Sequence, residues 1–285
     1  MKRIIDLLRT FNELVMFQHT IFSLPFILIA MIVAADGWFG WKLLLLGVLA
    51  AITARNFAMA LNRYVDRTFD AKNPRTSSRP SVDGRLQPWM VSSFAILNAF
   101  AFIFIALSIN TLAFWLSFPI LIVLGSYSYF KRFSALAHLV LGISLGLAPI
   151  AGVVAVSEQI TIWSVLLSFG VMFWVAGFDL LYSLQDIEFD KKTGLHSIPS
   201  RYGADATMFI AQIFHFNTVI FWLLFSWSAN LGFFGFLATI VGAFMLYYEH
   251  HLVTKDTNEI NRAFFTVNGY LGVAFLIFII IDKVL

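Results

Sequence analysis

Long apolar runs alternate along the chain with mostly short polar connections. About nine of these runs contain roughly twenty residues each, the length that an α-helix needs to cross the apolar core of a bilayer. Turns such as ADGW at 35–38 and SAN at 228–230 separate several of them. The pattern predicts membrane-spanning helices at 14–35, 41–62, 88–108, 111–130, 135–156, 161–182, 206–227, 229–250 and 263–284.

Two polar connections are much longer than the others and cover about 66–87 and 183–205. They hold most of the acidic and basic residues of the chain. Long connections in compact proteins usually carry function. We therefore expect the chemistry of this protein on the membrane face where these two connections lie.

The composition agrees with a membrane protein. Of 285 residues, 60% are hydrophobic and only 12% are charged, and the mean hydropathy is +0.83. A soluble domain cannot cover so much apolar surface with so few charges. We expect an all-α, polytopic membrane protein that forms one domain over residues 1–285, with its helices around a central cavity. The absence of cysteine excludes disulfides, thiolate metal sites and cysteine nucleophiles.

Lysine and arginine are distributed unequally between the two sets of connections. If the N-terminus is inside, the inner connections hold nearly all of these cations, and the outer ones hold only Lys42 and Lys283. Cytoplasmic connections of membrane proteins carry this excess. We predict a multi-pass protein of the cytoplasmic (inner) membrane, with the N-terminus, the cavity mouth and the active site on the cytoplasmic side. The pI near 9.2 thus reports topology and not nucleic-acid binding.

Each long connection begins with oxygen-bearing side chains at helical spacing. NRYVDRTFD at 62–70 supplies one set, and DLLYSLQDIEFD at 179–190 supplies the other. The i, i+4 spacing places successive members on one helical face, so the two faces can converge on one polar cavity. Carboxylates gathered near a bilayer need a cation, and oxygen ligands without cysteine favour Mg²⁺. The two sets are Asn62, Asp66 and Asp70, and Asp179, Tyr182, Asp186 and Asp190.

Basic residues accompany these acids. Arginine and lysine beside a carboxylate-bound metal suit a polyanion, and the combination indicates a metal-bridged diphosphate. Seven of the cations in these two connections are Arg67, Lys72, Arg75, Arg79, Lys191, Lys192 and Arg201.

Three residues inside or at the end of the predicted spans add to this picture. Arg55 lies two turns before Asn62 on the same face, where a buried charge is costly. Its partner is either a carboxylate of the protein or a carboxylate of a ligand. Tyr127 and Lys131, again four residues apart, close the fourth span near the same membrane face. Lys131 has a second interpretation as an end residue that extends toward the interface.

Two other interpretations compete with an enzyme that binds diphosphate. An isolated D-x-x-x-D pattern is often a solvated helix end, but two such patterns at equivalent span ends argue against this. A transporter of Mg²⁺ or protons would place its carboxylates near the middle of spans. The acidic residues here lie at span ends among lysine and arginine.

The sequence resembles the UbiA superfamily of intramembrane aromatic prenyltransferases. NRYVDRTFD is similar to the first motif of that family, N-x-x-x-D-x-x-x-D, and DLLYSLQDIEFD is similar to the second. YSYFK at 127–131 resembles a Y-x-x-x-K element, and RTSSRP and GLHSIPSRYG also resemble family sequence. The chain departs from the family at Arg63, where relatives often have Asp.

The resemblance implies a polyprenyl diphosphate donor, an aromatic acceptor and Mg²⁺ as cofactor. The implied catalytic residues, which would bind two Mg²⁺ ions, are Asn62, Asp66, Asp70, Asp186 and Asp190. The implied substrate-binding residues are Arg55, Arg67, Lys72, Tyr127, Lys131, Asp179, Tyr182 and Arg201. In this interpretation Arg55 pairs with a carboxylate of the acceptor, which favours an aromatic acid over a neutral phenol.

The branch that the chain most resembles is that of 4-hydroxybenzoate polyprenyltransferases, through HTIFSLPF and GFDLLYSLQDIEFD. The expected acceptor is therefore 4-hydroxybenzoate or a similar hydroxyaryl carboxylate in quinone biosynthesis. 1,4-Dihydroxy-6-naphthoate, in a menaquinone route, is the alternative. The sequence carries no signal for prenyl length or oligomeric state.

Overall fold

The computed structural model describes residues 2–16, 22–255 and 259–284, and all regular elements in these residues are helical. The expectation of an all-α fold is confirmed. The elements are α1 Lys2–Val15, α2 Leu24–Ala35, α3 Trp41–Val65, α4 Arg67–Asp70, α5 Pro88–Ile109, α6 Thr111–Phe130, α7 Ala137–Ser157, α8 Ile162–Ser183, the 3₁₀-helix η2 Leu184–Asp186, α9 Ile187–Thr193, α10 Ile198–Ser228, α11 Phe233–Lys255, α12 Ile260–Arg262, the π-helix η4 Ala263–Val267 and α13 Asn268–Val284.

Eight helical segments within the described residues are long and apolar enough to cross a membrane. They correspond to the second to ninth predicted spans. The first predicted span, 14–35, contains α2, which has only 12 residues and rises about 18 Å at 1.5 Å per residue. That is less than the ~30 Å apolar core of a bilayer. Residues 17–21 of this run lie outside the described residues, so the total of nine spans stays a prediction.

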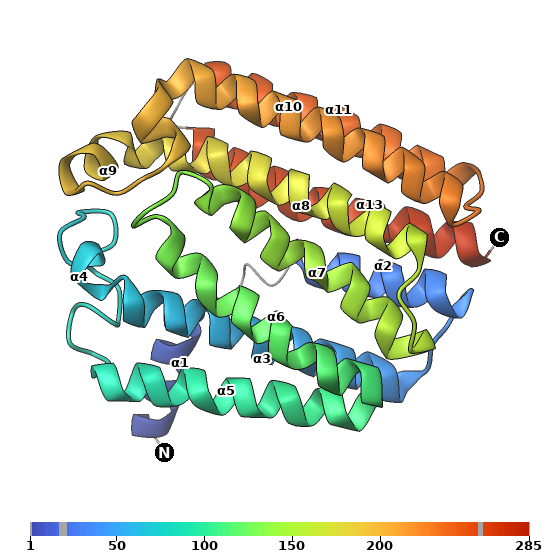
Figure 1. Ribbon diagram of the computed structural model, residues 1–285, viewed down its shortest axis with the longest axis horizontal. Coiled ribbons are helices and arrows are strands. Elements are labelled where there is room, and N and C mark those ends of the chain that lie inside the picture. The colour runs from blue at the N-terminus through green and yellow to red at the C-terminus, as the bar shows by residue number, and fades with distance from the viewer. Residues whose placement is uncertain (1, 17–21, 256–258, 285) are drawn as a thin grey trace.

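The helices lie side by side in a bundle, and the polar segments gather at its ends (Figure 1). α4 and α9, which come from the two long connections, lie together at one end. The C-terminus of α13 lies at the opposite end. The topology therefore brings the two motif-bearing connections to the same end of the molecule, although more than a hundred residues separate them.

The main core lies around α8, which packs against α7 on one side and α10 on the other. Trp174 and Trp222 are fully buried there with Phe26 and Phe275. The Phe26 and Trp222 rings stack at 5.7 Å, and the Phe275 ring meets Trp222 edge-on at 4.9 Å. Such aromatic pairs contribute about 0.5–1.5 kcal/mol beyond their area burial. This packing fills one side of the bundle and fixes the position of α8.

Glycine allows α7 to approach α8 closely. A Cβ atom at Gly142 would lie 2.4 Å from the backbone oxygen of Met172. We expect Gly142→Ala to destabilise the protein by about 1–3 kcal/mol, because the two backbones must separate. Thermal unfolding in detergent measures this as a lower Tm. Gly125→Ala in α6 is the matched control, because its Cβ would meet only the flexible end of Leu61 at 3.2 Å. Equal losses for both variants would contradict the interpretation.

Candidate active site

A cavity of about 890 Å³ lies between α3, α6, α7 and α8. Its polar part is lined by residues of α4, η2 and α9, at the end of the bundle where the two long connections meet (Figure 1). Its apolar part follows α3 toward the opposite end and is lined there by small side chains. The residues that α3 contributes to this apolar part are Gly47, Ala50, Ala51, Ala54 and Ala58.

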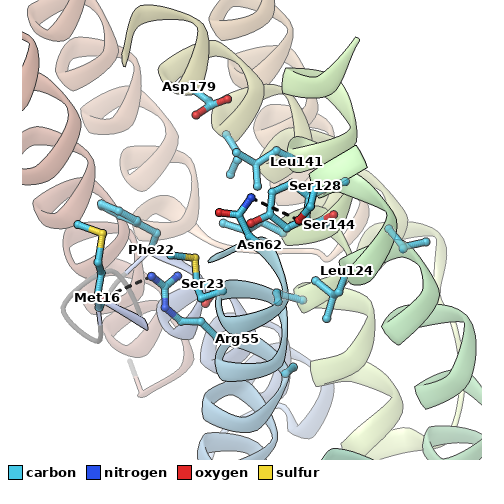
Figure 2. A pocket seen from close by; sticks show the side chains of 18 of the residues that line it. Met16, Phe22, Ser23, Arg55, Asn62, Leu124, Ser128, Leu141, Ser144 and Asp179 are labelled. Carbon is cyan, nitrogen blue, oxygen red and sulfur yellow. Dashed lines mark hydrogen bonds between the residues drawn. The ribbon is translucent and has the colours of Figure 1, made fainter. Parts of the chain in front are cut away.

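The first polar wall is the Asn62, Asp66 and Asp70 set. α3 ends at Val65 and α4 ends at Asp70, but the Asp66 and Asp70 amides still bond to the carbonyls four residues earlier. The helical spacing therefore continues through the junction, and all three side chains line the cavity. Asn62 Nδ2 donates to Asp66 Oδ2 at 2.7 Å and to Ser128 Oγ at 3.3 Å (Figure 2).

The second wall is formed by Asp179, Tyr182, Asp186 and Asp190, which line the same cavity from α8, η2 and α9. Asp179 Oδ2 lies 2.7 Å from His138 Nδ1 of α7. Asp190 is 2% exposed and accepts a hydrogen bond from Ser197 Oγ at 2.7 Å. The two sequence motifs thus face one cavity, as the spacing predicts.

The chain after α4 joins the two walls. Asn73 Nδ2 donates to Asp186 Oδ1 at 3.3 Å. Arg75 binds Asp186 through two nitrogens, at 2.6 and 3.2 Å, and donates to the Tyr182 hydroxyl at 3.0 Å. Arg79 pairs with Asp70 at 2.6 Å. These contacts place two guanidinium groups among the carboxylates of the cavity.

The sequence alone does not indicate these contacts. Arg75 and Arg79 lie in RTSSRP, and Ser197 lies in GLHSIPSRYG, two stretches that resemble family sequence, but the resemblance assigns no contact to them. Asn73 and His138 belong to no motif. These contacts follow from the tertiary arrangement of the connections and of α7.

Three predicted substrate-binding cations do not line the cavity. Arg67 Nε donates to the backbone oxygen of Ser81 at 2.8 Å. Lys72 is exposed, and Arg201 is exposed with its guanidinium over the Tyr202 ring at 5.4 Å. Contact of these three residues with phosphate stays a prediction.

Lys131 and Tyr127 do line the cavity, at the end of α6. The Lys131 carbonyl accepts a hydrogen bond from the His196 amide at 2.7 Å, which ties α6 to the second connection. Burial alone would lower the pKa of the Lys131 ammonium, but four carboxylates of the two walls raise it, Asp190 most strongly. Lys131 therefore lies within the electrostatic influence of both acidic walls.

Arg55 lies deeper, on the same helix as Asn62, and points toward the end of α1 (Figure 2). Its Nη2 donates to the backbone oxygen of Met16 at 3.3 Å, and its buried Nε has no hydrogen-bond partner among the described residues. In the same part of the chain, no carboxylate lies within ion-pair distance of this guanidinium. The alternative of a protein carboxylate as its partner therefore finds no support there.

The described side chains do not by themselves form a ready metal site. Within residues 2–16, 22–255 and 259–284, no three acidic or histidine side chains are grouped closely enough to do so. The arginines explain this in part, because Arg79 and Arg75 pair with an aspartate on each wall. Among the carboxylates of the two walls, Asp70 has one oxygen, Oδ2, that is buried without a hydrogen-bond partner in the part of the chain that the structure describes.

Comparison with protein families matches residues 23–279 to the UbiA prenyltransferase family. The chain belongs to this family. It is therefore a multi-pass membrane prenyltransferase, and the resemblance to the UbiA superfamily is confirmed. The UbiA match covers most of the chain, including every residue of the two walls.

Individual relatives agree with the family. The 4-hydroxybenzoate octaprenyltransferase of Herminiimonas arsenicoxydans is 30% identical over 258 residues, 89% of each chain. The apo structure of a UbiA homolog from Aeropyrum pernix K1 superposes with a TM-score of 0.83, at 29% identity over 93% of this chain and 98% of that one. A UbiA homolog from Archaeoglobus fulgidus, solved with GPP and Mg²⁺, has a TM-score of 0.78 over 97% of this chain and 100% of that one. Its sequence identity is only 18%, so this comparison shows the shared fold alone.

Proposed function

We propose that this UbiA protein transfers a polyprenyl group from a polyprenyl diphosphate to 4-hydroxybenzoate or a similar hydroxyaryl carboxylate, as a step of quinone biosynthesis. The main observation behind the proposal is that one cavity has a polar and an apolar part. Aspartates and cations line one end, and small apolar residues of α3 line the rest of its length along that helix. A diphosphate with an apolar tail matches both parts. The name of the Herminiimonas relative supports 4-hydroxybenzoate as the acceptor.

The donor set of the two walls fits Mg²⁺. Burial and the Asp70 carboxylate raise the pKa of Asp66, and this rise outweighs the lowering effect of Lys131 and Arg132. Oxygen ligands without thiolates suit a hard divalent ion. We assign Asp66, Asp70, Asp186 and Asp190 as the residues that hold it. When bound, Mg²⁺ supplies Lewis-acid stabilisation of the diphosphate as a leaving group.

Asn62 has a more specific part in this arrangement. Its amide nitrogen faces Asp66, and its oxygen accepts a hydrogen bond from Arg63 Nη1 at 2.9 Å. In this arrangement it orients Asp66. The Asn62 amide oxygen has a second lone pair, so the predicted ligation of metal by Asn62 is compatible with its bond from Arg63.

The cations of the cavity act on the phosphate oxygens. Arg75, Arg79 and Lys131 line the polar part, and the two arginines donate to Asp186 and Asp70. Once the aspartates are engaged by metal, the two guanidiniums are free to donate to the diphosphate. Fixed cations in a water-poor site stabilise the negative charge that develops on the departing diphosphate.

The acceptor enters the same cavity near Arg55 and Tyr127. The allylic C–O bond of the donor breaks, and the ring carbon beside the hydroxyl forms a bond to the allylic carbon and then loses its proton. The apolar lining limits the access of water, which would otherwise capture the allylic carbon as a free prenol. Arg55 balances the charge of the acceptor carboxylate.

We further propose that the polar end of the bundle faces the cytoplasm, because lysine and arginine concentrate in its connections.

A product assay tests the function. Purified protein in lipid nanodiscs receives one polyprenyl diphosphate, Mg²⁺ and an equimolar mixture of 4-hydroxybenzoate and 1,4-dihydroxy-6-naphthoate. We expect mass spectrometry to detect prenylated 4-hydroxybenzoate as the main product. If only 1,4-dihydroxy-6-naphthoate is prenylated, then the naphthoate, and not 4-hydroxybenzoate, is the acceptor. No prenylated aromatic acid would contradict the proposed function.

A further inference from the structure

A buried histidine of α7 contacts the first aspartate of the second wall. His138 is fully buried near the start of α7 and does not line the cavity. Its Nδ1 lies 2.7 Å from Asp179 Oδ2, and its buried Nε2 has no hydrogen-bond partner among the described residues. An ionised carboxylate only accepts hydrogen bonds, so we assign the proton of this bond to Nδ1. The bond therefore holds Asp179 through one of its two oxygens.

Close packing of α7 against α8 sets the position of this pair. His138 lies one turn before Gly142, where a Cβ atom would lie 3.1 Å from the Cβ of Ala176. Ala176 in turn lies about one turn before Asp179 on α8. The two partners are thus built on helices that touch through their backbones next to the bond. This packing gives the Asp179 carboxylate one fixed orientation.

Asp179 differs from the four aspartates that we assign to Mg²⁺. Its side chain is 19% exposed and lines the cavity. Arg75 and Arg79 pair with other aspartates, and within residues 2–16, 22–255 and 259–284 no arginine lies within ion-pair distance of Asp179. In the same ranges its second oxygen, Oδ1, accepts no hydrogen bond. Asp179 therefore offers the cavity a carboxylate oxygen that no arginine neutralises.

The depth of Asp179 places it beside the proposed acceptor and away from the diphosphate. Asp179 lies seven residues before Asp186, and Arg55 lies seven residues before Asn62. α8 and α3 both run toward the polar end of the bundle (Figure 1). At 1.5 Å per residue, Asp179 and Arg55 both begin about 10 Å deeper than those two residues. Both side chains line the same cavity (Figure 2). This is the part of the cavity in which the acceptor ring is proposed to lie.

We propose that Asp179 is the base that removes the ring proton of the acceptor, and that His138 is the residue that positions it. This inference rests on the proposed prenyl transfer to a hydroxyaryl carboxylate. Once the ring carbon beside the hydroxyl has bonded to the allylic carbon, it carries a hydrogen and the prenyl group together. Asp179 Oδ1 takes this hydrogen as a proton, and the electron pair of the broken C–H bond returns to the ring, which becomes aromatic again. The proton passes from Asp179 to water after product release.

The part of His138 in this step is indirect. By donating to Oδ2, it keeps Oδ1 directed into the cavity, and a base must be held within hydrogen-bond reach of the proton that it removes. His138 touches neither substrate in this arrangement, because it lies behind the cavity lining. It is therefore a positioning residue.

Ring deuteration of the acceptor tests the assignment of Asp179. 4-Hydroxybenzoate with deuterium at both carbons beside the hydroxyl is compared with the undeuterated acid in the wild type and in Asp179→Asn. We expect Asp179→Asn to lower kcat by about 10²- to 10⁴-fold, the contribution of a positioned proton acceptor. The deuterated acid should then react more slowly than the undeuterated acid by a factor of about two or more, because proton transfer has become the slow step. In the wild type this ratio should be smaller. The rise of Tm with Mg²⁺ should be the same in both proteins, because Asp179 is not a metal ligand.

Variants of His138 test the positioning role. His138→Phe keeps a buried ring and removes the hydrogen bond, so we expect kcat to fall by about 10- to 100-fold through misplacement of the base. Both KM values should change less than about twofold, and the isotope effect should exceed that of the wild type. His138→Asn, whose amide donates from a similar place, should recover part of the loss. His251→Phe, an exposed histidine near the end of α11, is the control and should leave kcat and the isotope effect unchanged.

Distinct outcomes would overturn the proposal. A kcat of Asp179→Asn within about twofold of the wild type would remove Asp179 as the base. A higher KM for the acid with an unchanged isotope effect would make Asp179 a binding residue only. A His138→Phe protein with a lower Tm but an unchanged isotope effect would give His138 a structural role alone, and if this variant does not fold, His138→Asn decides. In each case the wild type still prenylates the acid, so the proposed function stands. If the wild type prenylates no aromatic acid, the proposed function fails and the assignment of the base fails with it.

Discussion

Asp66→Asn is expected to lower kcat/KM for prenyl transfer by about 10³-fold, at the upper end of the loss caused by removing one group that stabilises developing charge. The substitution keeps the shape of the side chain but removes the charge that would hold Mg²⁺ on the first wall. The loss should fall mainly on kcat, because the diphosphate still finds Arg75, Arg79 and Lys131. Single-turnover assays with radiolabelled 4-hydroxybenzoate measure the remaining rate.

The experiment must distinguish a loss of catalysis from a loss of protein stability. The ion pair that Asp66 loses, with Arg132 at 3.5 Å, is partly exposed and contributes little to stability. The Tm of Asp66→Asn should therefore stay close to that of the wild type. Asp205→Asn, an exposed aspartate at the start of α10 outside the cavity, is the matched control and should keep full activity. Full turnover by Asp66→Asn would remove this residue from the metal site.

Removal of divalent metal is expected to abolish prenyl transfer, and added Mg²⁺ should restore it. The aspartates of the two walls line one cavity, and among the described residues no arginine lies within ion-pair distance of Asp179 or Asp190. Saturating Mg²⁺ should also raise the stability of the protein, by about 2.7 kcal/mol at one hundred times its Kd. Activity after EDTA treatment and Mg²⁺ titration, together with Tm in parallel samples, provides the two readouts.

The stability readout makes the metal experiment specific. In a variant with both Asp66→Asn and Asp190→Asn, the rise of Tm with Mg²⁺ should disappear, because one ligand of each wall is lost. Asp205→Asn should retain it. If EDTA leaves turnover unchanged, or if the double variant gains as much stability as the wild type, the four aspartates do not hold the metal.

Local patterns determined most of the fold. The predicted span 111–130 has the bounds of α6, and the predicted span 161–182 differs from α8 by one residue at each end. Run length and hydropathy suffice here, because a helix in a bilayer must satisfy its backbone internally and cover about the same thickness each time. The prediction is less accurate where the chain leaves the membrane. α10 begins at Ile198, eight residues before the predicted span, and a break at Gly203 with φ of 83° separates its interfacial turn from the rest.

Some features of the candidate site could likewise be predicted from the sequence, and others could be recognised only in the tertiary structure. The i, i+3 and i, i+4 spacings placed the seven residues of the two walls on two helical faces, because helical periodicity fixes which side chains share a face. They did not identify Arg75 and Arg79 as the cations that reach the aspartates, nor the absence of a carboxylate partner for Arg55 and Arg63 among the described residues. Those relations depend on where the irregular chain between α4 and α5 and the end of α1 lie in space. Only the packed structure decides them, because contacts between distant segments have no local period in the sequence.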